Sequence, residues 1–271
     1  MVILREFRPQ LNMTSCLINK GDAVDWLQNL PDASVDLIVT DPPYESLEKH
    51  RAVGTTTRLK HSKASSNDWF EIFPNCRFQE LFRELYRVLK KNSHFYLFCD
   101  QETMFVAKPI AENVGFRFWK PLIWDKQRIG MGYHYRSRYE LVLFFEKGKR
   151  KLNDLGISDV IAVPRIHNGY PAEKPVAVSE TLIRQSTNID ELVIDPFMGS
   201  GSVGVAALTL KRRFMGNDIC EEAIKVTKIR LFDHVAYDGN GVRIDTQFLD
   251  KRIGDIAEEQ TSSFIHRNGT R

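Results

Sequence analysis

The sequence predicts an α/β fold in one domain, built on a doubly wound, mostly parallel sheet. Short apolar runs alternate with segments of helical periodicity along most of the chain, which is the pattern of successive βαβ units. The 271 residues, of which 42% are hydrophobic, suffice for one large core. Polar motifs directly follow two of the apolar runs, where ligands bind in sheets of this class.

The first half of the chain contains regular strand and helix patterns. Val24, Leu27 and Leu30 share one helical face, and the apolar run that begins at Val35 has the character of a buried strand. The expected elements are a strand over 17–19, a helix over 23–30, a strand over 35–40, a helix over 79–89, a strand over 95–99 and a helix over 103–113.

The second half continues the alternation after two adjacent strands. Aromatic and β-branched residues favour sheet positions in both of these strands. The expected elements are strands over 116–125 and 140–146, a helix over 175–186, a strand over 192–194, a helix over 203–211, a strand over 213–215 and a helix over 221–233.

Two segments lack this periodicity. Residues 45–68 contain Gly54 and several basic residues, and a loop of this length is often functional; we expect a mobile loop. The tail over 237–271 is polar. We therefore expect one catalytic domain over 1–236, followed by a C-terminal tail.

Composition excludes several classes of protein and favours one partner. No apolar run approaches the roughly 20 residues of a membrane span, the first residues lack a secretion signal, and the four cysteines form no C-x-x-C pair. These features predict a cytoplasmic protein without a membrane partner. Residues 117–151 carry ten basic and three acidic side chains, which favours a polyanionic partner.

The tetrapeptide Asp41-Pro42-Pro43-Tyr44 directly follows a predicted strand. Two prolines fix the backbone and add no N–H groups. The Asp41 carboxylate and the Pro42 carbonyl are then suited to accept both N–H groups of an amine on an aromatic base and to direct its lone pair at an electrophile. Tyr44 can stack on a flipped base. A strand-ending turn is the structural alternative.

A second motif, residues 195–201, follows the strand over 192–194 and opens a helix. Its glycines permit close approach of a nucleotide-like ligand. The motif lacks both the dinucleotide fingerprint and a phosphate-binding lysine. Asp218 follows at a spacing suited to ribose hydroxyls, so the combination favours an adenosine ligand.

On these residues the chain resembles the DNA amino-methyltransferases of the circularly permuted β group, in which the catalytic motif precedes the cofactor motif. Asp218 stands where the family more often has glutamate, and Tyr170 where it usually has histidine. Residues 19–23, 124–126, 138–140 and 170–175 are also similar. The resemblance implies a Rossmann-like, class I methyltransferase fold, S-adenosylmethionine as cofactor, S-adenosylhomocysteine as product and no catalytic metal.

The resemblance also implies a set of site residues. Catalysis is assigned to Asp41, Pro42, Pro43 and Tyr44. Cofactor binding is assigned to Asp22, Ala23, Asp41, Lys174, Pro175, Asp195, Phe197, Gly199, Ser200, Gly201 and Asp218. The expected DNA-binding residues are Arg51, Arg58, Lys60, Lys63, Arg128, Arg136 and Arg138, with a small target-recognition insert near 148–169.

The expected reaction is site-specific methylation of N6 of adenine in DNA, because the motif begins with aspartate where N4-cytosine enzymes usually have serine. Three alternatives stay open: N4 methylation of cytosine, methylation of a glutamine amide or an RNA base, and a non-catalytic DNA-binding regulator with the same fold. The sequence leaves open whether the chain forms a homodimer, and whether it has a restriction partner, is solitary or is phage-encoded.

Overall fold

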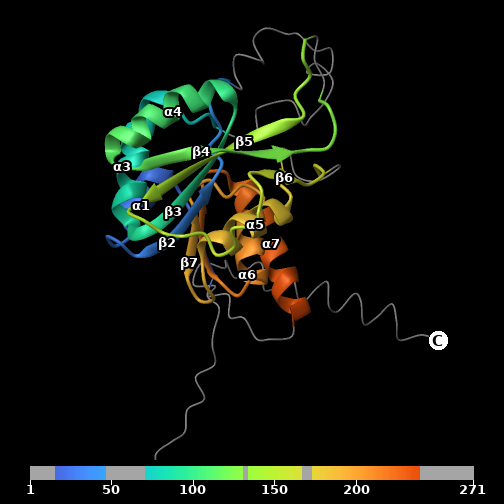
Figure 1. Ribbon diagram of the computed structural model, residues 1–271. Coiled ribbons are helices and arrows are strands. Elements are labelled where there is room, and N and C mark those ends of the chain that lie inside the picture. The colour runs from blue at the N-terminus through green and yellow to red at the C-terminus, as the bar shows by residue number, and fades with distance from the viewer. Residues whose placement is uncertain (1–15, 47–70, 131–133, 167–172, 239–271) are drawn as a thin grey trace, which may run out of the picture.

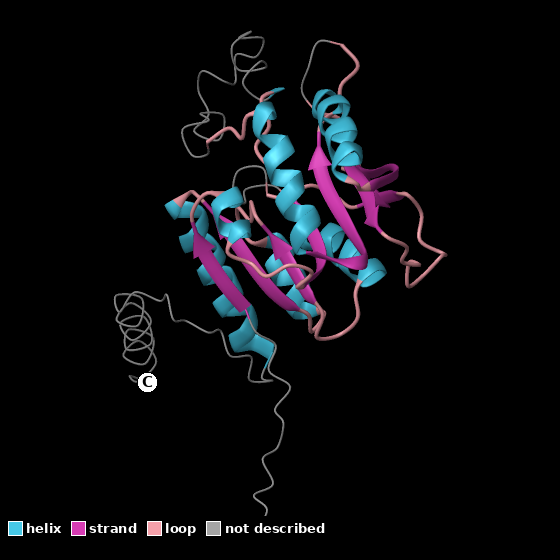
Figure 2. Cartoon of the chain, turned by 90° about the vertical axis from the view of Figure 1, so that its left-hand side faces the viewer, coloured by secondary structure: helices cyan, strands magenta, loops and turns pink. Residues whose placement is uncertain are grey.

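The computed structural model describes residues 16–46, 71–130, 134–166 and 173–238, except for the side chains beyond Phe232. An eight-stranded sheet runs through the molecule with helices on both faces (Figures 1 and 2). The strands are β1 (Cys16–Lys20), β2 (Val35–Thr40), β3 (Leu89–Cys99), β4 (Arg117–Asp125), β5 (Tyr139–Lys147), β6 (Val160–Ala162), β7 (Leu192–Asp195) and β8 (Arg213–Asp218).

The sheet has the order β1-β8-β7-β2-β3-β5-β4-β6. Neighbouring strands are parallel except at β5, which is antiparallel to both β3 and β4. The helices are α1 (Ala23–Gln28), a 3-10 turn (Asn75–Arg77), α3 (Phe78–Val88), α4 (Gln101–Val114), α5 (Val176–Ser186), α6 (Ser202–Thr209) and α7 (Glu221–Asp238). The predicted doubly wound, mostly parallel α/β fold is confirmed.

Two hydrophobic cores lie on opposite faces of the sheet. Along β3, Phe95 packs in the core with α1, α3 and α4, whereas Tyr96 packs in the core with α5, α6 and α7, because successive strand side chains point to opposite faces. All six residues of β2 are buried. Burial on both faces explains why the strand reads as a continuous apolar run.

Each strand and helix predicted from the sequence is present, with two corrections. Strand β3 begins at Leu89 and not at residue 95. Its first part contains the exposed Lys91 and Asn92, so it has no apolar pattern. Strand β6 was not predicted; it has three residues, two of them exposed, and pairs only with the edge of β4 in the described part of the sheet.

The neighbouring strands β2, β7 and β8 bring the two sequence motifs together. Leu37 pairs with Val193 and Asp195 pairs with Gly216, so Asp41, Asp195 and Asp218 all come at the carboxyl edge of the sheet. Within the described residues, no helix is long and apolar enough to cross a bilayer.

Candidate active site

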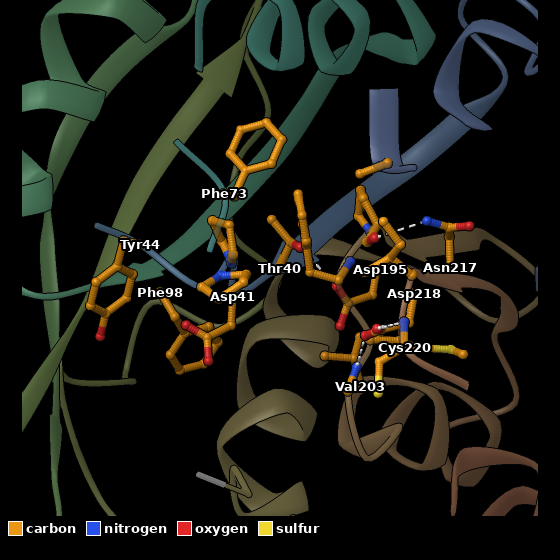
Figure 3. A pocket seen from close by; sticks show the side chains of 18 of the residues that line it. Thr40, Asp41, Tyr44, Phe73, Phe98, Asp195, Val203, Asn217, Asp218 and Cys220 are labelled. Carbon is orange, nitrogen blue, oxygen red and sulfur yellow. Dashed lines mark hydrogen bonds between the residues drawn. The ribbon is translucent and has the colours of Figure 1, made fainter. Parts of the chain in front are cut away.

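A cavity of about 440 Å³ lies at the carboxyl edge of the sheet. Figure 3 shows Tyr44, Asp41 and Phe98 at one end and Asp195 and Asp218 toward the other. The two predicted motifs therefore line one continuous space. The expected site residues in its wall are Asp22, Ala23, Asp41, Pro42, Pro43, Tyr44, Lys174, Asp195, Phe197, Gly199, Ser200 and Asp218. Pro175 and Gly201 do not line the described wall.

The Asp41 end of the cavity has a fixed backbone. The N–H of Phe73 donates to the Pro43 carbonyl at 2.7 Å, and Tyr44 and Phe73 form an isolated β-bridge. No described residue donates to the Pro42 carbonyl. This carbonyl and the carboxylate of the preceding residue, Asp41, are thus the acceptors that this turn presents.

Lys174 has a partner that the sequence did not reveal. Its ammonium forms an ion pair with Oδ2 of Asp41 and lies 3.3 Å from the Glu140 carboxylate. Burial raises the pKa of Asp41 above the usual range, and the charge of Lys174 offsets this only in part. The expected contact of Lys174 with the cofactor stays a prediction; within the protein, its ammonium contacts Asp41 and Glu140.

Asp195 ends β7 and is almost fully buried. Its Oδ1 accepts hydrogen bonds from the Thr40 hydroxyl at 2.7 Å and the Phe197 N–H at 3.1 Å. Burial raises the pKa of this carboxyl to about 7, against the lowering effect of both hydrogen bonds. No cation from the described residues pairs with it.

The loop after Asp195 contains two glycines with different surroundings. Both have positive φ, +49° at Gly199 and +78° at Gly201, which favours glycine. A Cβ at Gly199 would meet open space within 4 Å, whereas one at Gly201 would lie 2.6 Å from the Thr227 side chain. At Gly201, glycine permits the loop to pack on α7, whereas Gly199 leaves space for a ligand. The expected cofactor contacts of both glycines stay predictions.

Asp218 is held by backbone N–H groups. Its Oδ2 accepts from Gly199 and its Oδ1 from Cys220, both at 2.9 Å. Each carboxylate oxygen retains a further lone pair. Burial raises the pKa of Asp218, and these hydrogen bonds oppose the rise. The arrangement orients the carboxylate for a pair of hydroxyl donors.

Asp22 is already engaged within the protein. Its side chain caps α1 by accepting from the Val24 N–H at 2.9 Å and pairs with Arg77 at 2.7 Å. The Arg77 guanidinium lowers the pKa of Asp22, which burial alone would raise. Arg77 also lines the cavity, and nothing in the sequence pattern had indicated it.

The expected DNA-binding residues fall into two sets. Arg51, Arg58, Lys60 and Lys63 lie outside the described residues. Arg128, Arg136 and Arg138 are exposed between β4 and β5, and Arg138 forms two hydrogen bonds to Asp125, at 2.6 and 2.7 Å.

The basic segment over 117–151 does not form one surface. Along β3 and β5, Cys99 pairs with Leu141 near Asp41, whereas Ser93 pairs with Lys147 at the opposite edge of the sheet. The basic residues at and after the end of β5 are therefore remote from the cavity. Among the described residues of this segment, the end of β4 and the start of β5, with the residues next to them, lie at the edge that carries the site.

The cavity wall suits a cationic ligand that carries a ribose. Asp195 supplies a carboxylate without a described cation, and Asp218 supplies an oriented acceptor. The Ser179 hydroxyl, which sequence reasoning missed, lines the cavity fully buried and without a partner among the described residues. Gly199 leaves open space for close approach. These features fit S-adenosylmethionine.

Comparison with known proteins identifies the family. The profile of the DNA methylase family (N6_N4_Mtase) matches residues 35–159 and 155–229, most of the chain. The chain belongs to this family. It is therefore a DNA amino-methyltransferase that uses S-adenosylmethionine, which confirms the resemblance to this family.

Individual relatives of this methyltransferase agree with that assignment. YubD of Escherichia coli K12, which carries a methylase name, is 31% identical over 215 residues, covering 78% of this chain and 88% of YubD. The DNA adenine methyltransferase YhdJ of the same organism is 27% identical over 251 residues, covering 78% of this chain and 81% of YhdJ. Type II methyltransferase M.HpaI of Haemophilus parainfluenzae is 27% identical over 239 residues, covering 78% and 72%.

Solved structures share the fold of the methyltransferase. The PvuII DNA methyltransferase, which is cytosine-N4-specific, superposes with a TM-score of 0.63 at 17% identity, covering 90% of this chain and 92% of its own. The complex of M1.HpyAVI with S-adenosylmethionine gives 0.57 at 23% identity, covering 80% and 98%.

Proposed function

We propose that this methyltransferase transfers the methyl group to N6 of adenine in DNA. The observation that carries the proposal is Asp41 beside the Pro42 carbonyl in the cavity wall, with no described donor on that carbonyl. Aspartate as the first residue of the motif supports adenine. So does the similarity to YhdJ, which is named a DNA adenine methyltransferase.

The residues at this end of the cavity act on the target base. Asp41 and Pro42 accept the two N–H groups of the amine, which directs its lone pair away from the aromatic ring. Tyr44 stacks on the base after it leaves the duplex. As the nitrogen–methyl bond forms, the carbon–sulfur bond would break with its electron pair left on sulfur. The methylated amine would pass one proton to the Asp41 carboxylate, which leaves a neutral methylated base.

The other end of the cavity holds the cofactor, which supplies a methyl group on a positively charged sulfur. Asp195 binds its ammonium group, Asp218 binds its ribose hydroxyls, and Gly199 allows close approach of the loop. Phe197, Ser200 and the segment at Asp22 and Ala23 complete the wall. The residues between β4 and β5, with Arg128 and Arg136, contact DNA phosphates.

Mass spectrometry of nucleosides tests this proposal. DNA from a strain without its own methylation is incubated with S-adenosylmethionine and either the wild-type protein or Asp41→Ala. The expected product is N6-methyl-2′-deoxyadenosine, and Asp41→Ala is expected to form none. N4-methylcytosine would instead support the alternative that the PvuII fold similarity keeps open, and no methylated base with a folded, cofactor-bound protein would support a non-catalytic regulator.

A further inference from the structure

Four charged side chains from four separate segments form a network of ion pairs that starts at Asp41. Its members are Asp41, Lys174, Glu140 and Lys126. The Lys174 ammonium contacts Oδ2 of Asp41 and lies 3.3 Å from Oε2 of Glu140. The Lys126 ammonium then contacts Oε1 of Glu140 at 2.5 Å. Glu140 belongs to β5, Lys126 follows β4, and Lys174 precedes α5. Glu140 therefore receives two cations, whereas Asp41 receives one.

This network of ion pairs is partly shielded from water, and aromatic rings lie beside both of its lysines. The four side chains are between 14% and 29% exposed. Lys174 lies 5.6 Å from the centre of the Phe98 ring, and Lys126 lies 5.2 Å from that of Trp124. Charges act on one another more strongly where water is partly excluded. A change at Glu140 is therefore felt at Asp41 although the two carboxylates do not touch.

The two carboxylates respond differently to the shared lysine. Burial raises the pKa of both, but Lys174 and Lys126 together bring the pKa of Glu140 below its usual range, while the pKa of Asp41 stays raised. Burial alone would lower the pKa of Lys174, but Asp41 and Glu140 raise it. Lys174 is thus a stable cation, and Asp41 is the better proton acceptor of the two carboxylates.

One oxygen of Asp41 is left for the substrate. Lys174 binds Oδ2, and no described residue donates to Oδ1. The fixed lysine prevents rotation of the carboxylate, because rotation would break a charged hydrogen bond in a partly dry site. Since Glu140 and Lys126 hold that lysine from the other side, the orientation of Asp41 depends on residues that do not contact the base.

We propose that Glu140 is a positioning residue of this methyltransferase: together with Lys126, it holds Lys174 against one oxygen of Asp41 and leaves the other oxygen for the target amine. The inference rests on the proposed function and deepens it. It also assigns Lys174, expected at the cofactor, to the base-binding end of the cavity.

Other ionisable groups also surround Asp41 and enter the test as constants. They belong to the motif itself, to the end of β3, to the start of α4 and to the end of β7: Tyr44, Cys99, Asp100 and Asp195. None of them is changed in the variants below. Differences between variants in the pH at which the rate falls therefore report on the network of Lys174, Glu140 and Lys126.

The test compares Glu140→Gln, Lys126→Met and the double variant. Single-turnover methyl transfer to DNA is measured across pH with saturating cofactor, and the pH at which the rate falls on the acid side is determined. Glu140→Gln removes an anion near Asp41, so this acid limb moves to lower pH. Lys126→Met removes a cation, so the limb moves to higher pH, and the double variant returns toward wild type.

The expected shifts in pH are large enough to measure, and a variant at a remote ion pair serves as the control. Each shift is expected to be roughly half to one pH unit, and Glu140→Gln is expected to slow the plateau rate about tenfold, with unchanged affinity for S-adenosylhomocysteine. Glu112→Gln removes the carboxylate of an exposed pair with Lys108 on α4 and should leave the profile unchanged. Limbs that coincide, or that move in the same direction, would overturn the inference.

The same data separate this inference from the proposed function. Tritium transfer from labelled cofactor to DNA reports methylation whichever base accepts it. A wild-type protein without transfer would refute the proposed function. An active wild type whose variants keep its acid limb would refute only the role of Glu140.

Discussion

Asp41 and Asp195 follow or end neighbouring strands and line the same cavity, yet their carboxylates have different partners. Asp41 is paired with the Lys174 ammonium. Asp195 accepts only neutral donors among the described residues, from Thr40 and Phe197. Burial raises the pKa of both carboxyls, and for Asp195 to about 7.

This difference corresponds to the ligands that the two residues are proposed to bind. A carboxylate that already has a cation can accept hydrogen bonds from a neutral amine without attracting a second charge. A buried carboxylate without a cation is costly, and a bound cation relieves that cost. One end of the cavity is thus suited to a neutral substrate group and the other to a cationic cofactor.

The largest expected effect is at Asp41. Asp41→Asn removes the negative acceptor while preserving shape, so the rate of methyl transfer should fall by at least about 10²- to 10³-fold. Affinity for S-adenosylhomocysteine should stay within a factor of about three. Transfer assays and calorimetric titration measure the two quantities. Near-normal turnover would remove Asp41 from the mechanism.

Asp195→Asn should show the opposite division. Loss of a charged contact with the cofactor ammonium costs about 1.5–3 kcal/mol, hence roughly 10- to 100-fold in cofactor affinity. The rate at saturating cofactor should change much less. An unchanged dissociation constant would show that the ammonium binds elsewhere.

Stability provides an independent control for Asp195→Asn. A carboxyl whose pKa is raised in the folded state carries no penalty below its unfolded pKa, and the penalty grows until pH reaches the folded value near 7. The variant should therefore gain free energy of unfolding relative to wild type between about pH 4 and pH 7, by up to a few kcal/mol. Urea unfolding at several pH values measures this, and a constant difference would contradict it.

Cofactor affinity should also depend on pH through Asp195. The ammonium group needs the ionised carboxylate, so affinity should fall as pH decreases below about 7, by at most about tenfold per pH unit. Asp195→Asn should lack this dependence. Calorimetry from pH 5.5 to about 8 compares the two proteins.

The smallest expected effect is at Thr40. Its hydroxyl donates to Asp195, which favours the ionised carboxylate. Thr40→Val should raise the pKa of Asp195 further and move the acid fall in cofactor affinity upward by roughly one pH unit. Affinity at pH 9 should match wild type. A fall at the wild-type pH would assign the titration to another group.

Local patterns in the sequence sufficed for the fold class, for most of the strands and helices and for both motifs. The apolar run of β2 reflects burial of the strand on both faces, and the glycines after Asp195 reflect the positive φ angles of their own loop. The ion pair between Lys174 and Asp41 joins residues 133 positions apart, and no local pattern records it. Strand β6 is too short to show a period of its own, and the division of the basic segment follows from the antiparallel direction of β5.

The contact between Pro43 and Phe73 protects the Asp41 turn from changes of length in the segment that follows it. The Ser46 hydroxyl donates to Asp100 at 2.6 Å, and the Phe73 N–H donates to Pro43 at 2.7 Å, so the chain on either side of residues 47–70 is attached to the sheet. Doubling the length of a segment with fixed ends costs only about 0.6 kcal/mol. Changes of length between these anchors should therefore leave the backbone at Asp41 and Pro43 in place.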